Sequence, residues 1–276
     1  QSLMQLTYAK LLNEDGSLNT ETKAYINLKD RVHNSINRGV KKGEIAQEDA
    51  ENRFNIDMKK GLESSFKTGL DCDEYDPLCD HILIIDKTKN RTIGTYRLLL
   101  RSRLSEEGRF YCEQEFDIEN IKKLKGEILE MGRSCVHKDY RSNSILHLLW
   151  AGIIEYFKKN GVRYVIGCPS IYTLDPAEIS EIYTLIKRKY LAPEIFRVSP
   201  KEGKAVVPLN DQAMALEGKE NRILLKLPSL VRSYLKVGAL VCGEPAVDRE
   251  FGTVDLLMLL EVAHMSASYL RRFRIK

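Results

Sequence analysis

The sequence has few of the features that would place it in a specialised class of protein. None of its apolar runs approaches the roughly 20 residues that a membrane-spanning helix needs. Its first residues lack the pattern of a secretory signal peptide. No internal repeat or low-complexity linker divides its 276 residues. We therefore expect a cytoplasmic globular protein, built as one large domain or as one domain with an extension.

Cysteine usage and charge exclude further classes. The six cysteines form no C-x-x-C pair, so neither a zinc site nor, in a chain of this length, a disulfide framework is expected. They are interpreted as mostly buried thiols of a reducing compartment. The net charge of +4 is too small to indicate nucleic-acid binding, although it permits a basic groove for an acidic partner. No metal and no tightly bound cofactor is expected.

Residues 1–60 differ in pattern from the rest of the chain. They are rich in charge and poor in β-branched residues. Four of their apolar residues recur at helical spacing: Tyr25, Leu28, Val32 and Ile36. We predict a helical N-terminal extension over residues 1–60 and a main domain over residues 61–276. The extension either packs on the main domain as a support or acts as a lid or docking element.

The main domain mixes strand and helix signals. The apolar runs HILIID and IGTYRLLLRS flank the polar KTKNRT and predict a β-hairpin. ILEMGRSCV predicts a strand, which the polar loop HKDYRSNS joins to an amphipathic helix ending at Gly161. Further expected elements are strands at FYCEQEF, RYVIGCPS and RILLKLP, helices at 118–127, 176–190, LVRSYLKVG and 254–273, and a strand or loop at ALVCGEPAVD. This order predicts an α/β (α+β) fold with helices against a mixed sheet and excludes a helical bundle.

The stretch FYCEQEF, at residues 110–116, alternates acids with aromatic residues. On a strand, Glu113, Glu115 and Asp117 would share one face. That face could line a pocket in which an acid pairs with a substrate ammonium group or with Arg97. The alternative is an edge strand with a solvated acidic face.

Residues 129–150 form a strand–loop–helix unit. The start of a helix offers unpaired backbone N–H groups and the positive end of the helix dipole, which together suit a phosphate group. Lys138 and Arg141 would add positive charge there. The alternative is an ordinary connection with a solvated basic loop.

This unit resembles the acyl-thioester-binding segment of the GNAT acyltransferase superfamily, with its strand, V-x-x-x-Y-R loop and helix. Over residues 71–269 the chain resembles more closely the haemolysin-like, ornithine-lipid-type N-acyltransferases. The similar segments are HILIID, IGTYRLL, FYCEQEFDI, LEMGRSCVHKDYRS and LKLPSLVRSYLKVGALVCGEPAVDREFGTVD. The resemblance implies a GNAT-like, mostly antiparallel sheet. It also implies transfer of a long-chain (3-hydroxy)acyl group from acyl carrier protein to the α-amine of ornithine, glycine or lysine. The co-substrate would be the 4′-phosphopantetheine thioester of that carrier.

A fainter similarity links the segments CDEYDPLCDHILIID, GTYRLL and LEMGRSCV to acyl-homoserine-lactone synthases. In that family, acidic and arginine residues on these segments form a charged cluster near the reaction centre. The matching residues are Asp73, Asp76, Arg97, Glu130 and Arg133. A signal synthase of that kind is therefore one alternative, and a non-catalytic protein that binds an acyl carrier or a membrane is another.

The loop departs from the superfamily pattern in one respect. Most GNAT loops are rich in glycine, which lets the backbone approach a pyrophosphate closely, whereas RSNSIL contains none. The departure is compatible with a phosphopantetheine arm delivered by a carrier protein. The resemblance assigns five residues to that arm: Cys135, Val136, Lys138, Arg141 and Ser144.

Amide formation from a thioester needs a base for the amine. Glu130 is the first candidate; its alternatives are an ion pair with Arg97 or Arg133, or binding of the substrate amine. Glu130 and Arg133 are odd-spaced, so on a regular strand they would face opposite sides unless a bulge at Gly132 intervened. His137 is the second candidate base, or else a surface loop histidine.

Further residues are candidates for holding the substrates. Arg97 and Arg133 suit the carboxylate of an amino acid, because guanidinium binds carboxylate bidentately. Ser134 could place a hydroxyl near the thioester. Cys135 is either an acyl-enzyme nucleophile or, as we favour, a core cysteine. By resemblance to GNAT enzymes, Tyr172 could donate a proton to the leaving thiol.

The fatty chain needs an apolar cleft. Trp150, Leu146, Leu149 and the apolar residues of 223–241 could line it, or could simply form core. The C-terminal YLRRFRIK interleaves basic and apolar residues, which permits contact with anionic lipid at the inner face of the membrane. The alternative is a frayed basic terminus.

Overall fold

The computed structural model describes residues 4–9, 73–140, 143–206, 209, 218–249 and 251–265. The chain divides into two compact units, one of residues 9–77 and one of residues 1–8 with 78–276, and each is considered by itself. Within residues 1–60 the structure describes only a strand, at Met4–Ala9. The helices expected in this range lie outside the described residues. The expected boundary between extension and main domain stays a prediction.

The described elements follow one another along the chain as a mixture of strands and helices. The strands are β1 (Met4–Ala9), β2 (Asp80–Asp86), β3 (Arg91–Leu100), β4 (Phe116–Asp117), β5 (Glu127–Val136), β6 (Val162–Gly167), β7 (Ser170–Ile171), β8 (Ser199–Pro200), β9 (Leu240–Val241), β10 (Ala246–Asp248), β11 (Thr253–Asp255) and β12 (Met258–Glu261). The α-helices are α4 (Glu119–Lys122), α5 (Asn143–Asn160), α6 (Pro176–Lys189), α7 (Glu220–Lys226) and α8 (Ser229–Val237). The 3-10 helices are η2 (Asp76–Leu78), η3 (Arg101–Arg103), η4 (Tyr111–Gln114), η5 (Lys138–Tyr140), η6 (Glu194–Phe196) and η8 (Val262–His264).

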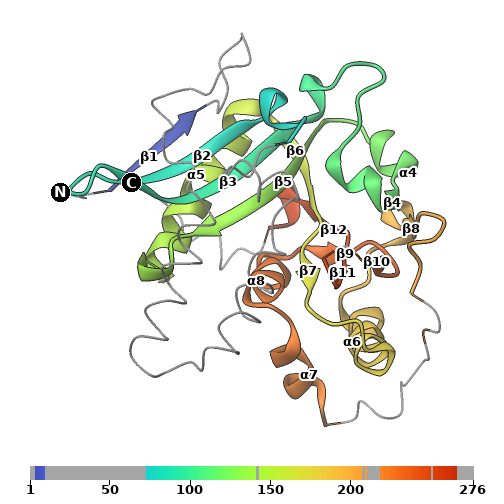
Figure 1. Ribbon diagram of the computed structural model, residues 1–276. Helices are drawn as coiled ribbons and strands as arrows, with labels where there is room; N and C mark the ends of the chain where they lie inside the picture. Colours follow the sequence, from blue (N-terminus) through green and yellow to red (C-terminus); the bar gives the residue numbers. More distant parts are fainter. Residues whose placement is uncertain are drawn as a thin grey trace, which may run out of the picture. The chain divides into compact units, whose positions relative to one another are not determined.

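A mixed sheet forms the centre of the larger unit, in the strand order β1-β2-β3-β5-β6-β12-β9 (Figure 1). Strands β5 and β6 run parallel, whereas the pairs β2–β3, β3–β5, β6–β12 and β12–β9 are antiparallel. Two small sheets accompany it, β10-β11-β7 and β4-β8. The expected mixed, mostly antiparallel sheet is therefore confirmed.

The long, strongly patterned elements lie where the sequence predicts them. Strands β2 and β3 form the hairpin, and Asp86 at its turn accepts the N–H of Thr88 at 2.9 Å. Helix α5 ends before Gly161, whose φ of 61° suits a residue without a side chain. Gly238, with φ 110°, ends α8 in the same way.

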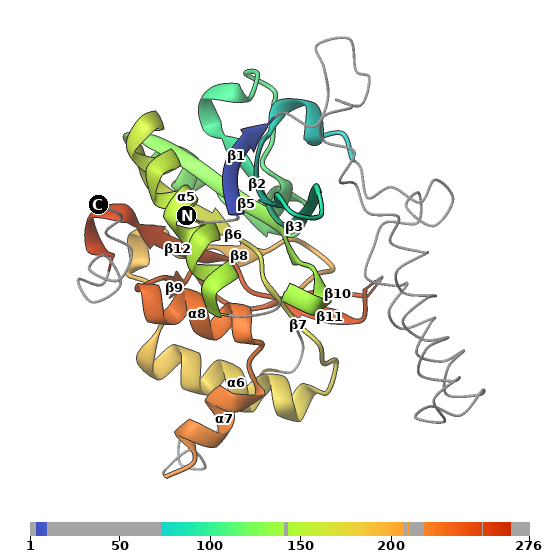
Figure 2. The same cartoon turned by 90° about the vertical axis from the view of Figure 1, so that its left-hand side faces the viewer.

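Helices α5 and α8 cover one face of the central sheet. Helix α5 packs against β2, β3 and β6, and its Trp150 meets Tyr234 of α8 edge to face, with ring centroids 6.2 Å apart. Both views show α6, α7 and α8 gathered at one end of the unit (Figures 1 and 2). Among the helices of the described residues, none has both the length and the apolar character that crossing a membrane requires.

The prediction of a strand at RILLKLP is wrong, because these residues form α7 and its C-cap. Ile223 and Leu227 are buried, whereas Leu225 between them is 73% exposed. Burial four residues apart is the helical repeat, and a strand would have buried every second residue. The mixture of isoleucine and leucine concealed that repeat in the sequence.

The prediction of a last helix over residues 254–273 is also wrong for the described part, 254–265. This part forms β11, β12 and η8. Every residue from Thr253 to Leu260 is buried, since β12 lies between β6 and β9 in the sheet. A strand buried on both faces gives a continuous apolar run with no period, which sequence alone does not distinguish from a buried helix. Residues 266–276, including the basic C-terminal segment, lie outside the described residues.

Candidate active site

Glu130 lies on β5 with its buried carboxylate held by two backbone N–H groups. Tyr111 donates its N–H to Oε2 at 2.6 Å, and Cys112 donates its N–H to Oε1 at 2.8 Å. Burial raises the pKa of Glu130, while these two N–H groups and the charge of Arg97 oppose the rise. A buried carboxyl with a raised pKa is suited to accept a proton near neutral pH.

The two N–H donors belong to FYCEQEF, which corrects the expectation of a strand there. The segment forms η4, and only Phe116–Asp117 is extended, pairing with β8. Glu113 closes the turn, because its Oε1 accepts the N–H of Phe110 at 2.9 Å and its Oε2 pairs with Lys122 at 3.1 Å. Buried aromatic residues at both ends and the contacts to Glu130 impose the turn, so the acids do not share one face.

Two arginines lie beside Glu130, on the same side of the sheet. The guanidinium groups of Arg97, on β3, and Arg133, on β5, each lie 5.6 Å from the ring centre of Tyr111. Arg97 is only 5% exposed. The structure thus brings Glu130, Arg97 and Arg133 together around Tyr111, as the similarity to a charged reaction centre led us to expect.

A β-bulge places Arg133 on that side. Thr95 pairs with Cys135 and Arg97 with Gly132, so two intervening residues of β5 face one residue of β3. Arg133 takes a positive φ of 48°, a strained conformation for a residue with a side chain. The sequence suggested a bulge at Gly132; the two residues of β5 that face one residue of β3 are Arg133 and Ser134. The bulge interrupts the regular hydrogen-bond ladder between β3 and β5 at this point.

Strands β5 and β6 separate at the same level. They pair from Glu127 with Val162 up to Glu130 with Ile166, yet β5 continues to Val136. Gly167 ends β6 in close contact with the backbone, since a Cβ placed there would lie 2.9 Å from the carbonyl oxygen of Met131. The point at which β6 ends and β5 continues, here called the opening between the strands, therefore lies directly beside Glu130 and the bulge.

Substituting Gly167→Ala is expected to lower both stability and activity, because the new methyl group forces the two strands apart at the opening. We expect about 1–3 kcal/mol of lost stability. Chemical denaturation would measure the loss, and the rate of acyl transfer would be compared at a temperature where both proteins are folded. The control is Ala177→Gly, at an exposed position of α6. Gly203→Ala would not serve as a control, because Gly203 has a φ of 78°, at which an added side chain is strained. Unchanged stability and rate in Gly167→Ala would contradict the close approach.

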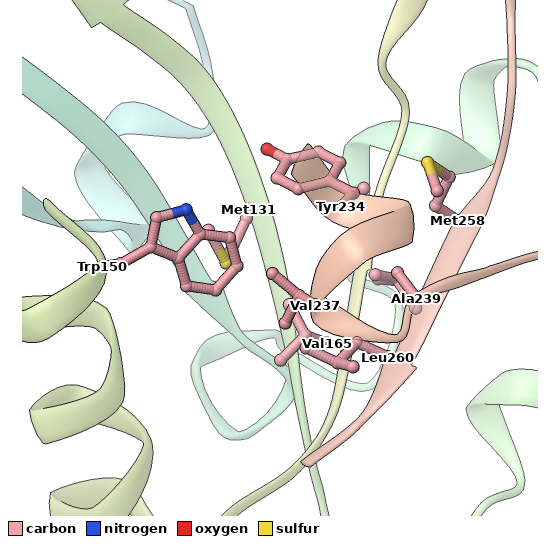
Figure 3. Close-up of a pocket in the computed structure, with 10 residues that line it drawn as sticks. Met131, Trp150, Val165, Tyr234, Val237, Ala239, Met258 and Leu260 are labelled. Atoms are coloured by element: carbon pink, nitrogen blue, oxygen red, sulfur yellow. The ribbon is translucent and has the colours of Figure 1, made fainter. Parts of the chain in front are cut away.

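An apolar cavity of about 30 Å³ lies on the α5 and α8 side of this opening (Figure 3). Its walls come from β5, β6, β12, α5, α8 and the residues before β9. They are Met131, Trp150, Val165, Ile166, Gly167, Tyr234, Val237, Ala239, Met258 and Leu260. Trp150 and residues of the region 223–241 line this cavity and also belong to the core, whereas binding of the fatty chain there stays a prediction. Leu149 is fully buried core, and Leu146 is half-buried beside it.

Glu115 belongs to a second acidic group, together with Asp248 of β10 and Asp255 of β11. Carboxylate oxygens of the three residues lie within 4.8 Å of one another. Burial and the charge of Asp255 raise the pKa of Glu115 to about 8, and burial also raises the pKa of Asp255. Three carboxylates at this spacing would suit a cation. The expectation that the protein binds no metal stays a prediction.

Two thiols lie between Glu130 and this acidic group. Cys112 contacts both Glu130 and Cys168, and the charges of Glu130 and Glu115 both act on Cys168. Burial raises the pKa of Cys168 to about 11 and that of Cys112 well above its ordinary value. Both thiols therefore stay protonated at neutral pH and do not act as thiolate nucleophiles. The two thiols thus link Glu130 to the acidic group around Glu115, and together these residues form one continuous polar region.

His137, the second candidate base, is not part of this region. It lies beyond the end of β5, buried, with Nε2 against the guanidinium of Arg91 and Nδ1 3.9 Å from Oδ2 of Asp139. Both ring nitrogens are engaged, since Nδ1 also accepts the backbone N–H of Asp139 at 3.3 Å. A role for His137 as the base stays a prediction that the geometry does not support.

The residues expected near the thioester and the phosphopantetheine arm continue along β5. Cys135 and Val136 are half-buried, Ser134 is exposed at the bulge, and Cys135 pairs with Thr95. The side chains of Lys138, Arg141 and Ser144 lie outside the described residues. Their expected contacts with a phosphate stay predictions.

Four other expected residues lie on other segments of the chain. Tyr172 follows β7 and is 66% exposed. Asp117 is exposed and accepts the N–H of Glu119 at 3.2 Å, at the start of α4. Asp73 and Asp76 belong to the smaller unit, where the N–H of Asp73 donates to Oδ2 of Asp76 at 2.7 Å. Their proposed roles in binding substrate stay predictions.

Sequence reasoning missed several residues of this region. They are Tyr111, Cys112, Cys168, Asp248 and Asp255. The sequence did carry a signal for the two aspartates, since each ends a short apolar run, AVD or TVD. A solvated turn would explain an aspartate at such a position equally well. No signal in the sequence indicated the role of Tyr111 and Cys112, because that role depends on backbone N–H groups.

Comparisons with known proteins place the chain in a family. The model of the acetyltransferase (GNAT) domain matches residues 51–151. An L-ornithine N(alpha)-acyltransferase of Rhodobacter capsulatus is 32% identical over 206 residues, which is 72% of this chain and 78% of that protein. An L-ornithine N(alpha)-acyltransferase of Brucella abortus is 30% identical over 211 residues, 72% of this chain and 73% of that protein.

Solved structures resemble the chain more loosely. An N-acyl amino acid synthase from uncultured soil microbes superposes with a TM-score of 0.43 at 8% identity, covering 95% of this chain and 94% of that one. A CoA-dependent acyl-homoserine lactone synthase gives a TM-score of 0.47 at 11% identity, covering 98% and 87%. The sequence relatives, similar over about three quarters of their own length, decide the assignment: this chain belongs to the family of L-ornithine N(alpha)-acyltransferases and is an acyltransferase.

Proposed function

We propose that this protein transfers a long acyl group from the thioester of an acyl carrier protein to the α-amine of ornithine. One observation supports it above the others: Glu130 and two arginines lie on one side of β5, and an apolar cavity lies on the other, beside an opening between β5 and β6. Charged groups suit an amino acid and an apolar cavity suits a fatty chain. The thioester would lie in the opening between them.

In the proposed reaction, Glu130 accepts a proton from the α-ammonium group of ornithine. The free amine attacks the thioester carbonyl carbon, and the carbonyl oxygen becomes an oxyanion. The backbone N–H of Ser134, at the bulge, would stabilise that charge. The attacking nitrogen loses its second proton as the carbon–sulfur bond breaks, and that proton neutralises the departing thiolate. Glu130 releases the first proton to solvent, and the products are the N-acyl amino acid and the free thiol. Arg97 and Arg133 would hold the carboxylate of the acceptor.

The acidic group of Glu115, Asp248 and Asp255 supports ornithine rather than glycine as the acceptor. Ornithine has a second ammonium group, at the end of its side chain, and glycine has none. An ammonium between the three carboxylates would relieve their mutual repulsion, which adds to burial in raising the pKa values of Glu115 and Asp255. The thiols Cys112 and Cys168 lie between this group and Glu130, so one diamine could reach both.

The choice of a carrier protein rather than coenzyme A as donor rests on the loop RSNSIL. It contains no glycine, and its last four residues already belong to α5, which begins at Asn143. A side chain at every position limits how closely the backbone can approach a pyrophosphate, which coenzyme A has and the carrier's arm lacks. The single phosphodiester of the arm needs less room.

A product analysis by mass spectrometry tests the proposal. The purified full chain would be incubated with an acyl carrier protein thioester, or with the matched coenzyme A thioester, and with ornithine, lysine or glycine. We expect N-acyl ornithine as the main product, formed faster from the carrier protein thioester. An equal yield from all three amino acids would overturn the assignment of ornithine. Absence of every N-acyl product, with intact donor remaining, would overturn the proposed reaction.

A further inference from the structure

We propose that the aromatic ring of Tyr111 positions the guanidinium groups of Arg97 and Arg133 and thereby makes the site select acceptors that carry a free carboxylate. The inference rests on the proposed function, because it concerns the acceptor of the same reaction. Tyr111 is in this sense a positioning residue, which acts through the two arginines and does not itself have to touch the substrate.

The ring of Tyr111 contacts cations from two neighbouring strands. Tyr111 is the first residue of η4 and is half-buried. Arg97 of β3 pairs with Gly132 of β5, and Arg133 follows Gly132 directly. The central guanidinium carbon of each arginine lies 5.6 Å from the centre of the ring, within the distance of about 6 Å at which a cation–π attraction acts. One ring therefore serves both arginines at the same distance.

The two arginines need such a partner to stay together. Positive groups gathered at one ring repel each other, and burial strengthens the repulsion because little water screens it. Arg97 is only 5% exposed, and Arg133 is half-buried at a strained φ of 48°. The negative potential at the face of the ring attracts both guanidinium groups and offsets part of these costs. The ring would therefore hold the pair in place before an acceptor arrives.

Glu130 cannot supply this attraction throughout the reaction. Arg97 and Glu130 attract each other, but in the proposed reaction Glu130 becomes neutral when it accepts the proton of the ammonium group. The ring of Tyr111 keeps its potential at every step. Its face also accepts no ordinary hydrogen bond, so it does not compete with the carboxylate of ornithine for the in-plane N–H donors of the arginines. A ring is thus better suited than a further carboxylate to hold two arginines that must bind an anion.

Tyr111 holds Glu130 and the arginines with different atoms. Its backbone N–H donates to Oε2 of Glu130 at 2.6 Å, whereas its ring contacts the arginines. A substitution of the side chain keeps the backbone donor, so it should affect binding of the acceptor more than proton transfer. We expect Tyr111→Leu, which has no ring, to raise KM for ornithine about tenfold while kcat changes less than about threefold.

The test compares ornithine with ornithinamide, in which an uncharged amide replaces the carboxylate, at a fixed concentration of the carrier protein thioester. The readout is the ratio of the two kcat/KM values, which a general loss of folding would not change selectively. We expect this ratio to fall about tenfold in Tyr111→Leu and to stay within about twofold of the natural value in Tyr111→Phe, which keeps the ring. Tyr183→Leu, at a half-buried position of α6, is the matched control and should keep the natural ratio.

A second pair of variants removes the potential of the ring without removing the ring. Phenylalanine and pentafluorophenylalanine at position 111 have nearly the same shape, but the fluorine atoms withdraw the negative potential from the ring face. The fluorinated variant should show a ratio about tenfold below that of Tyr111→Phe. This measurement remains informative if Tyr111→Leu does not fold.

The inference would be wrong if Tyr111→Leu or the fluorinated variant kept the natural ratio. It would also be wrong if Tyr111→Phe lost the preference as fully as Tyr111→Leu, because the hydroxyl would then be responsible. Equal kcat/KM values for ornithine and ornithinamide in the natural protein would overturn the inference while leaving transfer to ornithine intact. Absence of transfer to ornithine would overturn the proposed function and this inference together.

Discussion

Glutamine in place of Glu130 is expected to lower kcat/KM for ornithine by about 10²- to 10⁴-fold, the usual contribution of a general base. Glutamine has nearly the same shape as glutamate but cannot accept the proton of the ammonium group. The measurement is the initial rate of thiol release from the acyl carrier protein thioester at increasing ornithine concentration. Glu155→Gln, at an exposed position on α5, is the matched control.

The substitution also disturbs η4, since an amide nitrogen would face the N–H of Tyr111 or of Cys112. Hydroxylamine as the acceptor separates the two effects, because it is already uncharged at neutral pH and needs no base to become nucleophilic. We expect the Glu130→Gln defect to be much smaller with hydroxylamine than with ornithine. Equal defects with both acceptors would show that Glu130 acts by holding η4 and not by accepting the proton.

The second large effect is expected at Glu115. Its replacement by glutamine should raise KM for ornithine by about 10- to 100-fold, the value of a charge-assisted hydrogen bond that is largely shielded from water. The variant keeps the shape of the side chain but loses the charge that would face the second ammonium group. Steady-state rates with ornithine at fixed carrier protein thioester measure the change.

Norvaline provides the matched substrate for this test, because it has the ornithine skeleton without the terminal amine. The natural protein should prefer ornithine to norvaline strongly, and Glu115→Gln should lose most of that preference. Glu119→Gln, at an exposed position of α4, is the control and should behave as the natural protein does. If Glu115→Gln retained the full preference for ornithine, the terminal ammonium would have to bind elsewhere.

The same variant should change the dependence of stability on pH. The pKa of Glu115 is raised from 4.5 to about 8 in the folded chain. Between these values the folded state holds a proton that the unfolded state releases, so the stability from Glu115 is complete below about pH 4.5 and is lost as pH rises through about 8. The raised pKa of Asp255 acts in the same direction. The melting temperature of the natural protein should therefore fall across this range, and that of Glu115→Gln should fall less.

The sequence predicted those parts of the fold whose patterns are local. The β2–β3 hairpin follows from two apolar runs around a polar turn, and α5 follows from its helical repeat and the glycine after it. The run from Thr253 to Leu260 was misread because burial on all sides removes periodicity. Ile223 and Leu227 show the opposite case, in which a helical repeat too short to recognise was taken for a strand.

The residues of the candidate site also differ in how far the sequence could predict them. Glu130, Arg97 and Arg133 could be identified as candidates because their charged side chains suit the proposed chemistry and because their segments resemble those of a known family. FYCEQEF was misread because its structural role belongs to backbone N–H groups, which every residue except proline offers, and because their acceptor is a distant glutamate. Asp248 and Asp255 join Glu115 only through the pairing of β10 with β11, which no local pattern specifies.

The separation of β5 from β6 has a kinetic consequence. In the proposed arrangement, acceptor and donor enter from opposite faces of the sheet, so neither substrate would have to leave before the other binds. The initial-rate pattern should therefore be that of a ternary complex, with no acylated form of the protein between two half-reactions. The product would then span the point where the pairing of β5 with β6 ends, with its amino-acid head on one face and its fatty tail on the other. The need to draw one end through would make departure of the product, rather than bond formation, the natural candidate for the slow step at saturation.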